Sequence, residues 1–411
     1  MHRGLRTALT ALVLTSLLAG CGQAPSTSAP AHSTSQDDHL PAGASPGALV
    51  ACGSTEVAEY AGGKWTYFPA SSILSAPSTV FETVDVSSTG EVAAVTSGSP
   101  DASTPGMSSA NMLWTYRKGW HLVSIRNDTD VQLHSFGPDG TLYVVPDDGT
   151  LPGIWKRTQS GWKQLPGSAA LGYIASLAWS PQGVLTVVSV PQNGATTVWQ
   201  FEHGRFVPMT SDRVPFAADS VTVGFAPNGH LAVGTSAHGV WIDEGGRWIQ
   251  PGGVACPVTD VGQFGWSPSG VLTVSGKAES RDGLWQFSGG SWHQVQGLGP
   301  DIGADKIYEF GWSPTGVLTV SDATRCQIFE LVGGRWTPVW TKTHATDQNA
   351  VPPKFAWSPT GALVTNGGDL GGLWELSPKG DWVQIGGASS PFAGEVGVSF
   401  TFAPKSLVHA P

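Results

Sequence analysis

The sequence predicts an all-β protein that forms a single β-propeller, and two observations carry this prediction. A segment of the type FGWSPSGVLTV, found at 264–274, recurs along the chain with a glycine in its turn. The repeats follow at intervals of roughly 40 to 50 residues, which is typical of propellers and other repeat arrays. The chain also holds 54 glycines and 30 prolines among 411 residues, an excess expected from many tight turns. The turn glycines are Gly90, Gly140, Gly183, Gly229, Gly270, Gly316 and Gly361.

The first twenty residues have the pattern of a secretory signal. Arg3 and Arg6 precede an apolar stretch at 8–18, which is too short to span a membrane as a helix. The following Leu-Ala-Gly-Cys, which ends at Cys21, resembles the lipobox of a bacterial lipoprotein. The resemblance implies cleavage before Cys21 and acylation of that residue. We therefore expect residues 1–20 to be a signal peptide, and the mature chain to be lipid-anchored in the cell membrane, facing outside the cytoplasm in an extracellular or periplasmic location.

Residues 21–47 are rich in Ser, Ala and Pro and contain almost no large apolar side chain. Such a segment cannot bury enough surface to offset its ordering entropy, so we expect a flexible tether. The propeller is then predicted to occupy residues 48–411.

Each repeat predicts four strands, named A to D in chain order. Strand A runs into the Ser-Pro turn, strand B is the V-L-T-V run, strand C contains L-W-Q-F, and strand D begins at the next aromatic residue. The A–B turn is Pro-x-Gly or close to it, and the C–D turn is usually Gly-Gly or Lys-Gly, both of which favour hairpins. Four antiparallel strands of this length form one propeller blade.

The two ends of the chain set the number of blades. Seven complete repeats begin near residues 80, 131, 173, 220, 261, 307 and 353. A C–D half at 57–69 and an A–B half at 396–410 remain, and joining them would give an eighth blade without exposed edges. Eight blades is thus the prediction, and seven is the alternative. Strand B of the closing blade stays open between 49–51 and 407–408.

The eighteen tryptophans fall into columns of the repeat. Seventeen of them end strand A, lie in strand C or open strand D, and only Trp340 falls outside these columns. Buried tryptophans contribute large apolar areas, so the columns indicate packing between blades.

The connections that vary in length point to a ligand-binding face. Length differences are concentrated in the B–C and D–A connections, which emerge on one side of the ring, and variable loops on a rigid scaffold commonly carry function. Strand A residues near this side are expected to line the upper channel, where Glu309 and Lys354 fall in adjacent blades and could simply pair. The candidate ligand-binding residues are Thr83, Ser176, Thr222, Gln263, Glu309, Lys354, Arg213, Arg281 and Arg325.

The cysteines allow one disulfide and one free thiol besides Cys21. Cys52, Cys256 and Cys326 lie near the variable connections, and the pair formed by Cys256 and Cys326 is favoured if geometry allows it. Neither a C-x-x-C motif nor a clustered His/Cys/Asp signature is present, so we expect no metal and no cofactor.

The charge balance excludes some partners. The chain carries 21 basic and 31 acidic residues, a net charge of −10, without a basic run. Nucleic acid and anionic lipid surfaces are therefore disfavoured as partners.

The repeat also resembles known propeller families. The unit at 226–250 resembles repeats from the extracytoplasmic parts of two-component sensors, and the Ser-Pro-x-Gly turns resemble those of the periplasmic Tol-system propeller and of WD-type repeats. Sialidase propellers have Ser-x-Asp-x-Gly boxes, but here only Asp139 places an acid in the turn, at a shifted position. These resemblances imply the fold far more than the function.

Together these features predict a monomeric binding or scaffold module. Its partner would be an envelope protein, a peptide or a glycan, held through the variable face and without catalysis. The alternative is an extracytoplasmic hydrolase or lyase that acts on an anionic glycan through the loop arginines and Glu309.

Overall fold

The computed structural model describes residues 47–69, 80–97, 111–126, 130–147, 151–190, 196–209, 221–278, 281–297, 307–341 and 351–404. The predicted signal peptide, Cys21 and nearly all of the tether lie outside these residues. Among the described residues, none belongs to a helix long and apolar enough to cross a membrane.

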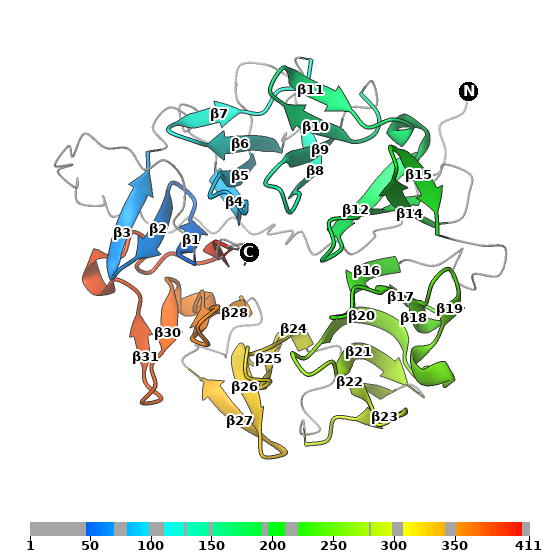
Figure 1. Ribbon diagram of the computed structural model, residues 1–411. Coiled ribbons are helices and arrows are strands. Elements are labelled where there is room, and N and C mark those ends of the chain that lie inside the picture. The colour runs from blue at the N-terminus through cyan, green and yellow to red at the C-terminus, as the bar shows by residue number, and fades with distance from the viewer. Residues whose placement is uncertain are drawn as a thin grey trace, which may run out of the picture.

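Eight four-stranded antiparallel sheets form a closed ring, with strand A innermost and strand D outermost (Figure 1). The predicted all-β propeller with eight blades is therefore confirmed. Blades 1 to 4, each from the channel outward, are β4 (Val80–Val86), β5 (Val92–Ser97), β6 (Met112–Tyr116), β7 (Trp120–Leu122); β8 (Val131–Phe136), β9 (Leu142–Pro146), β10 (Trp155–Thr158), β11 (Gly161–Gln164); β12 (Tyr173–Trp179), β13 (Leu185–Val190), β14 (Thr197–Glu202), β15 (Arg205–Pro208); and β16 (Val221–Phe225), β17 (Leu231–Thr235), β18 (Gly239–Asp243), β19 (Trp248–Ile249).

Blades 5 to 8 follow the same plan. They are β20 (Thr259–Trp266), β21 (Leu272–Ala278), β22 (Arg281–Ser288), β23 (Ser291–Gln294); β24 (Ile307–Trp312), β25 (Leu318–Asp322), β26 (Gln327–Val332), β27 (Arg335–Trp340); β28 (Phe355–Trp357), β29 (Leu363–Thr365), β30 (Trp374–Leu376), β31 (Trp382–Gln384); and β32 (Ser399–Phe402), β1 (Leu49–Cys52), β2 (Val57–Ala61), β3 (Lys64–Phe68). The described residues also form short 3-10 helices, namely η1 (Ser168–Ala170), η2 (Pro251–Gly253), η4 (Gly368–Leu370) and η5 (Gly387–Ser389).

The closing blade joins strands from both ends of the chain, as predicted. The N-terminal part supplies three of them and the C-terminal part supplies β32. β1 is the strand B that the sequence left open, and it pairs with β32 from Leu49 opposite Phe402 to Cys52 opposite Ser399. Residues 407–408 lie outside the described part.

The Ser-Pro-x-Gly segments form tight A–B turns for a local reason. In blade 5 the Gly270 N–H donates to the Ser267 carbonyl at 2.9 Å, and Gly270 adopts a φ of +85°, which L side chains rarely reach. The Ser267 hydroxyl oxygen accepts the Val271 N–H at 3.0 Å, so the turn satisfies its own backbone. The A–B and C–D turns emerge on one side of the ring, here called the turn face. The B–C and D–A connections emerge on the other side, the loop face.

Adjacent blades interlock through an aromatic ring and a glycine on their innermost strands. A methyl group on Gly224 would lie 3.1 Å from the ring of Phe264 in the next blade, and one on Gly311 would lie 3.4 Å from the ring of Phe355. The missing side chain thus makes room for the ring of the neighbouring blade, at the close packing expected of a protein core.

Two of the predicted channel residues also join neighbouring blades. The Gln263 amide donates to the Phe310 carbonyl at 3.2 Å, and its oxygen accepts the Phe310 N–H at 3.1 Å. In the next interface Glu309 accepts the Phe355 N–H at 2.6 Å. Burial raises the pKa of Glu309 to about 7, although this hydrogen bond and the nearby Lys354 ammonium favour the charged form.

Trp340, the tryptophan outside the predicted columns, is a core residue. Its side chain is 0% exposed and packs against Trp374 and Trp382, with ring centroids 5.9 and 4.9 Å away. It therefore belongs to the contact between blades 6 and 7, and the suggestion that it lies apart from the packing positions is wrong.

We expect Trp340→Ala to lower the free energy of unfolding by about 3–5 kcal/mol, because it leaves a large cavity between two blades. Urea denaturation followed by circular dichroism measures this change. Tyr173→Ala is the control, since Tyr173 is 56% exposed and its loss should cost no more than about 0.5 kcal/mol. Equal effects of the two substitutions would contradict the assignment of Trp340 to the core.

We expect Glu309→Gln to remove a pH dependence of stability. The pKa of Glu309 is higher in the folded chain than in the unfolded chain, so the folded chain holds a proton that the unfolded chain releases between about pH 4.5 and 7. Stability therefore falls as the pH rises through this window, by about 3 kcal/mol. A glutamine can make the same contact, as Gln263 does one blade earlier.

Urea unfolding at pH 5, 6, 7 and 8 tests this expectation. The variant should match the wild type at pH 5 and exceed its stability at pH 8. Glu244→Gln serves as the control because Glu244 is exposed. A difference between Glu309→Gln and wild type that stays constant over this range would show that Glu309 does not titrate as described.

Candidate functional site

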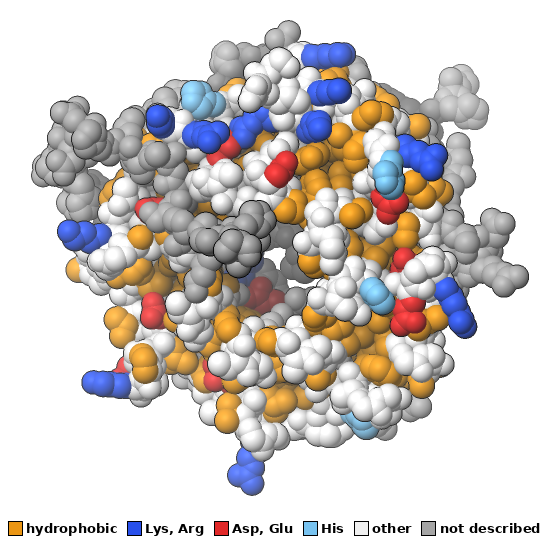
Figure 2. Space-filling model, in the orientation of Figure 1, with side chains coloured by type: hydrophobic (Ala, Val, Ile, Leu, Met, Phe, Trp, Pro, Cys, Tyr) orange, Lys and Arg blue, Asp and Glu red, His pale blue; other side chains and the backbone are white. Residues whose placement is uncertain are grey.

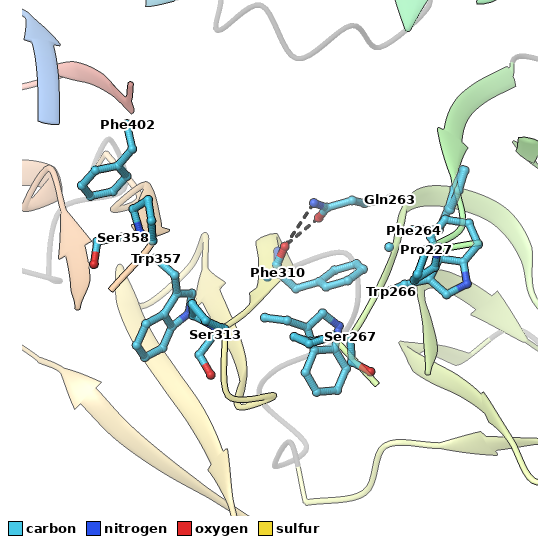
Figure 3. A pocket seen from close by; sticks show the side chains of 16 residues that line it. Pro227, Gln263, Phe264, Trp266, Ser267, Phe310, Ser313, Trp357, Ser358 and Phe402 are labelled. Atoms are coloured by element: carbon cyan, nitrogen blue, oxygen red, sulfur yellow. Dashed lines mark hydrogen bonds between the residues drawn. The ribbon is translucent and has the colours of Figure 1, made fainter. Parts of the chain in front are cut away.

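A cavity of about 540 Å³ lies where the innermost strands of blades 4 to 8 reach the turn face. The molecule is visibly hollowed at its centre (Figure 2). Residues from strand A and from the Ser-Pro turns follow one another in an arc around the cavity (Figure 3). Six of the lining side chains are aromatic: Phe264, Trp266, Phe310, Trp312, Trp357 and Phe402.

The repeat itself places these rings around the cavity. In each F-x-W unit the two aromatic residues are two positions apart on a strand, so they lie on the same face of the sheet. Phe264 and Trp266 show the arrangement, with ring centroids 5.6 Å apart in an edge-to-face contact. Trp266, Trp312 and Trp357 are half-buried, because each packs within a blade cluster and still lines the cavity.

The cavity offers few free polar groups. The hydroxyl oxygens of Ser313 and Ser358 accept backbone N–H groups of their own turns at 2.8 Å, and the Gln263 amide is bound to the Phe310 backbone. None of the lining residues has an ionisable side chain. A concave, apolar and aromatic site with few polar groups suits an uncharged, largely apolar group of a ligand.

The aromatic arc covers only one side of the ring. On the other side, between blades 1 and 2, Asp85 and His134 occupy the positions that hold Gly224 and Phe264 between blades 4 and 5. Burial lowers the pKa of His134, while the Asp85 carboxylate favours its charged form. The interface between blades 1 and 2 is thus polar where the interface between blades 4 and 5 holds a glycine and an aromatic ring. The cavity lies on the opposite side of the ring of blades.

A second groove continues the cavity outward between blades 4 and 5. It has a volume of about 280 Å³ and shares Pro227 and Trp266 with the central cavity. His230 and Glu244 are the titratable side chains that line it.

The predicted channel residues lie nearer the loop face than this cavity, and only Gln263 lines it. Thr83 and Thr222 are exposed, and Ser176 is half-buried. Gln263 and Glu309 are occupied with the backbone of the next blade. Lys354 attracts Glu309 electrostatically without forming an ion pair with it.

Of the three candidate arginines near the variable connections, only Arg325 has a side chain among the described residues. Arg213 lies outside the described residues, and Arg281 belongs to β22 without a described side chain. Arg325 is half-buried in the connection between β25 and β26, and it has interactions of its own.

The cysteines are free thiols in the structure, so the disulfide between Cys256 and Cys326 is not formed. Cys52 and Cys326 are buried, and burial raises the pKa of both thiols, that of Cys326 to about 11. Neutral buried thiols are poor nucleophiles. In the described part of the chain, His, Cys, Asp and Glu side chains form no group of three that could hold a metal ion.

The sequence reading missed the cavity because it assigned the strand A tryptophans to packing alone. The near-identical units at 264–268, 310–314 and 355–359 were the available signal, because they place the same aromatic residues at the same position in three neighbouring blades.

Comparisons with known proteins found similar solved structures, all with TM-scores below 0.5. No protein-family model matches the sequence, and no curated protein matches it either. Among solved structures, virginiamycin B lyase from Staphylococcus aureus is similar at 10% identity, over 69% of this chain and 90% of that chain, with a TM-score of 0.45. The β-propeller domain of the trilobed protease from Pyrococcus furiosus is similar at 13% identity, over 76% and 100% of the chains, with a TM-score of 0.47. The extracellular domain of a putative one-component system from B. thetaiotaomicron is similar at 11% identity, over 82% and 52% of the chains, with a TM-score of 0.39.

Proposed function

We propose that this chain is a monomeric, lipid-anchored extracytoplasmic binding or scaffold module that holds an apolar group of its ligand in the central cavity. The main support for this proposal is the cavity wall, which has six aromatic side chains and no ionisable group. Burying one large apolar side chain in such a site stabilises a complex by about 1.5–3 kcal/mol. The binding site is thus assigned to the turn face instead of the loop face expected from the sequence.

The chemistry of the cavity favours an apolar segment of a protein or peptide over a glycan. A glycan would bring many hydroxyl groups against serine hydroxyls and a glutamine amide that already have partners. Polar groups that lose their hydrogen bonds on binding reduce affinity.

The alternative, a hydrolase or lyase for anionic glycans, needs several titratable groups that converge in one pocket. In the two described cavities, His230 and Glu244 are the titratable groups, and both lie in the outer groove. No described observation favours this alternative over binding.

The lipobox at Cys21 supports attachment to the membrane. We expect Cys21→Ser to abolish incorporation of labelled palmitate in cells and to move the protein from the membrane fraction to the soluble fraction. Cys256→Ser, which changes another thiol, should leave both properties unchanged. Label retained by Cys21→Ser would place the acyl chain elsewhere.

We expect Trp312→Ala to weaken binding of an uncharged apolar ligand at least tenfold, because Trp312 lies between the rings of blades 5 and 7 in the cavity wall. Titration with the fluorescent probe N-phenyl-1-naphthylamine measures the dissociation constant. Acetyl-trileucine amide should displace the probe, whereas maltotriose should not.

Trp179→Ala is the matched control for this titration. Trp179 ends strand A of blade 3 at the same position of the repeat, but it is not among the lining residues of the cavity. An equal loss of affinity in both variants, or displacement by maltotriose alone, would refute the proposed ligand class.

A further inference from the structure

The C–D hairpins of the eight blades have the same place in the repeat, so their charges can be compared directly. In blades 3, 4, 6, 7 and 8 each hairpin carries an acidic residue near its turn: Glu202, Asp243, Glu330, Glu375 and Glu59. The paired part of the blade 5 hairpin, 285–294, has neither an acidic residue nor a Lys or Arg. The hairpins of blades 1 and 2, β6–β7 and β10–β11, carry no acidic residue. Their basic residues are Arg117, Lys118, Lys156, Arg157 and Lys163.

One of these cations is neutralised inside the protein. The Arg157 guanidinium contacts both carboxylate oxygens of Glu91 in the neighbouring blade, one of them at 2.6 Å, and Glu91 is only 4% exposed. Such a bidentate pair is a strong, oriented contact. Arg157 therefore belongs to the contact between blades 1 and 2.

The other four cations form what we call the basic patch: Arg117, Lys118, Lys156 and Lys163. Arg117, Lys118 and Lys163 are exposed, and Lys156 is half-buried. Within the described part of the chain, none of the four makes an ion pair. Lys156 and Lys163 lie directly opposite each other on β10 and β11, a like-charge arrangement that destabilises a sheet unless an anion is near.

The position of the basic patch can be compared with the turn face, where β1 begins. Figure 2 shows Lys and Arg side chains gathered over the region of β6, β7, β10 and β11. The Gly47 N–H donates to the Ala403 carbonyl at 3.0 Å, just beyond the pair of Leu49 and Phe402, where β32 reaches the turn face. Gly47, the first described residue, therefore lies at the turn face. Arg117 and Lys118 lie in the C–D turn of blade 1 on the same face, and Lys156 and Lys163 pair two positions before the end of their hairpin.

We propose that the basic patch docks on the anionic headgroups of a lipid membrane and holds the turn face toward it. The proposal rests on the proposed function, because it takes Cys21 as the lipid anchor. The tether that the composition of residues 22–46 predicts would span about 30 Å on average, so an anchor at Cys21 would keep the turn face near the bilayer. An acyl anchor combined with a polybasic surface is a known two-signal route to stable membrane attachment.

The placement of the cations favours a lipid surface over an acidic protein. They are spread over two neighbouring hairpins instead of lining a pocket, and a surface of many mobile headgroups can meet all of them. Each Lys or Arg close to an anionic membrane strengthens binding about fivefold.

Sedimentation with vesicles tests the proposal. The chain that begins at Gly22 is used, because it contains every strand of the ring and lacks the acylated Cys21. We expect it to pellet with vesicles of phosphatidylcholine and phosphatidylglycerol, but not with phosphatidylcholine alone. Binding should be lost at about 1 M salt, where the Debye length is about 3 Å.

The double substitution Lys156→Gln and Lys163→Gln should weaken vesicle binding about 25-fold, from two lost cations. Its stability should be unchanged or higher, because the like-charge pair is removed. Lys64→Gln with Lys379→Gln is the matched control, since both are exposed cations whose hairpins also hold an acid. This control should bind vesicles like the wild type.

Three results would overturn the proposal: equal binding to both kinds of vesicle, equal loss in the two double variants, or tighter binding to polyglutamate than to the anionic vesicles. Titration with N-phenyl-1-naphthylamine on the same samples separates this failure from that of the proposed function. Normal probe binding without vesicle binding refutes only the membrane docking. Vesicle binding without probe binding refutes only the ligand site in the cavity.

Discussion

The pairing of β1 with β32 is the contact on which the rest of the structure depends. It joins strands from opposite ends of the chain, and only its formation turns eight blades into a ring with a central channel and two distinct faces. The entropy cost of closing so long a loop grows only slowly with its length. An apolar cluster that includes Leu49, Phe392 and Val398 offsets this cost, and Glu395 adds contacts to the Ser54 backbone and hydroxyl.

The fold could be predicted from the sequence because the repeat fixes it locally. Each Ser-Pro-x-Gly turn satisfies its own backbone, so the strands on both sides can be read without knowing their neighbours. The division of the closing blade could not be read in this way. Both 49–51 and 407–408 are short apolar runs, and only the partner across the ring distinguishes them.

The site was harder to predict for a different physical reason. Loop length signals where a chain tolerates change, whereas a cavity depends on how side chains of neighbouring blades meet. Trp266 and Trp357 pack in a hydrophobic cluster and also line the cavity, so for these residues packing and binding are not mutually exclusive roles. The basic patch was invisible as well, because Lys156 and Lys163 become neighbours only when β10 pairs with β11.

The uneven charge of the ring gives it a means of orientation that the net charge hides. A net charge of −10 repels an anionic surface on average, yet repulsion acts mainly on the charges nearest that surface, since screening limits its range to about 10 Å. Among the described residues, only the C–D hairpins of blades 1 and 2 hold cations without an acid, so the ring has one favourable approach, with the acidic hairpins held away. The cavity opens on that same turn face, across the channel from the patch. A ligand that carries an apolar group close to a membrane would then meet the cavity without crossing the ring, which links the position of the aromatic arc to that of the charges.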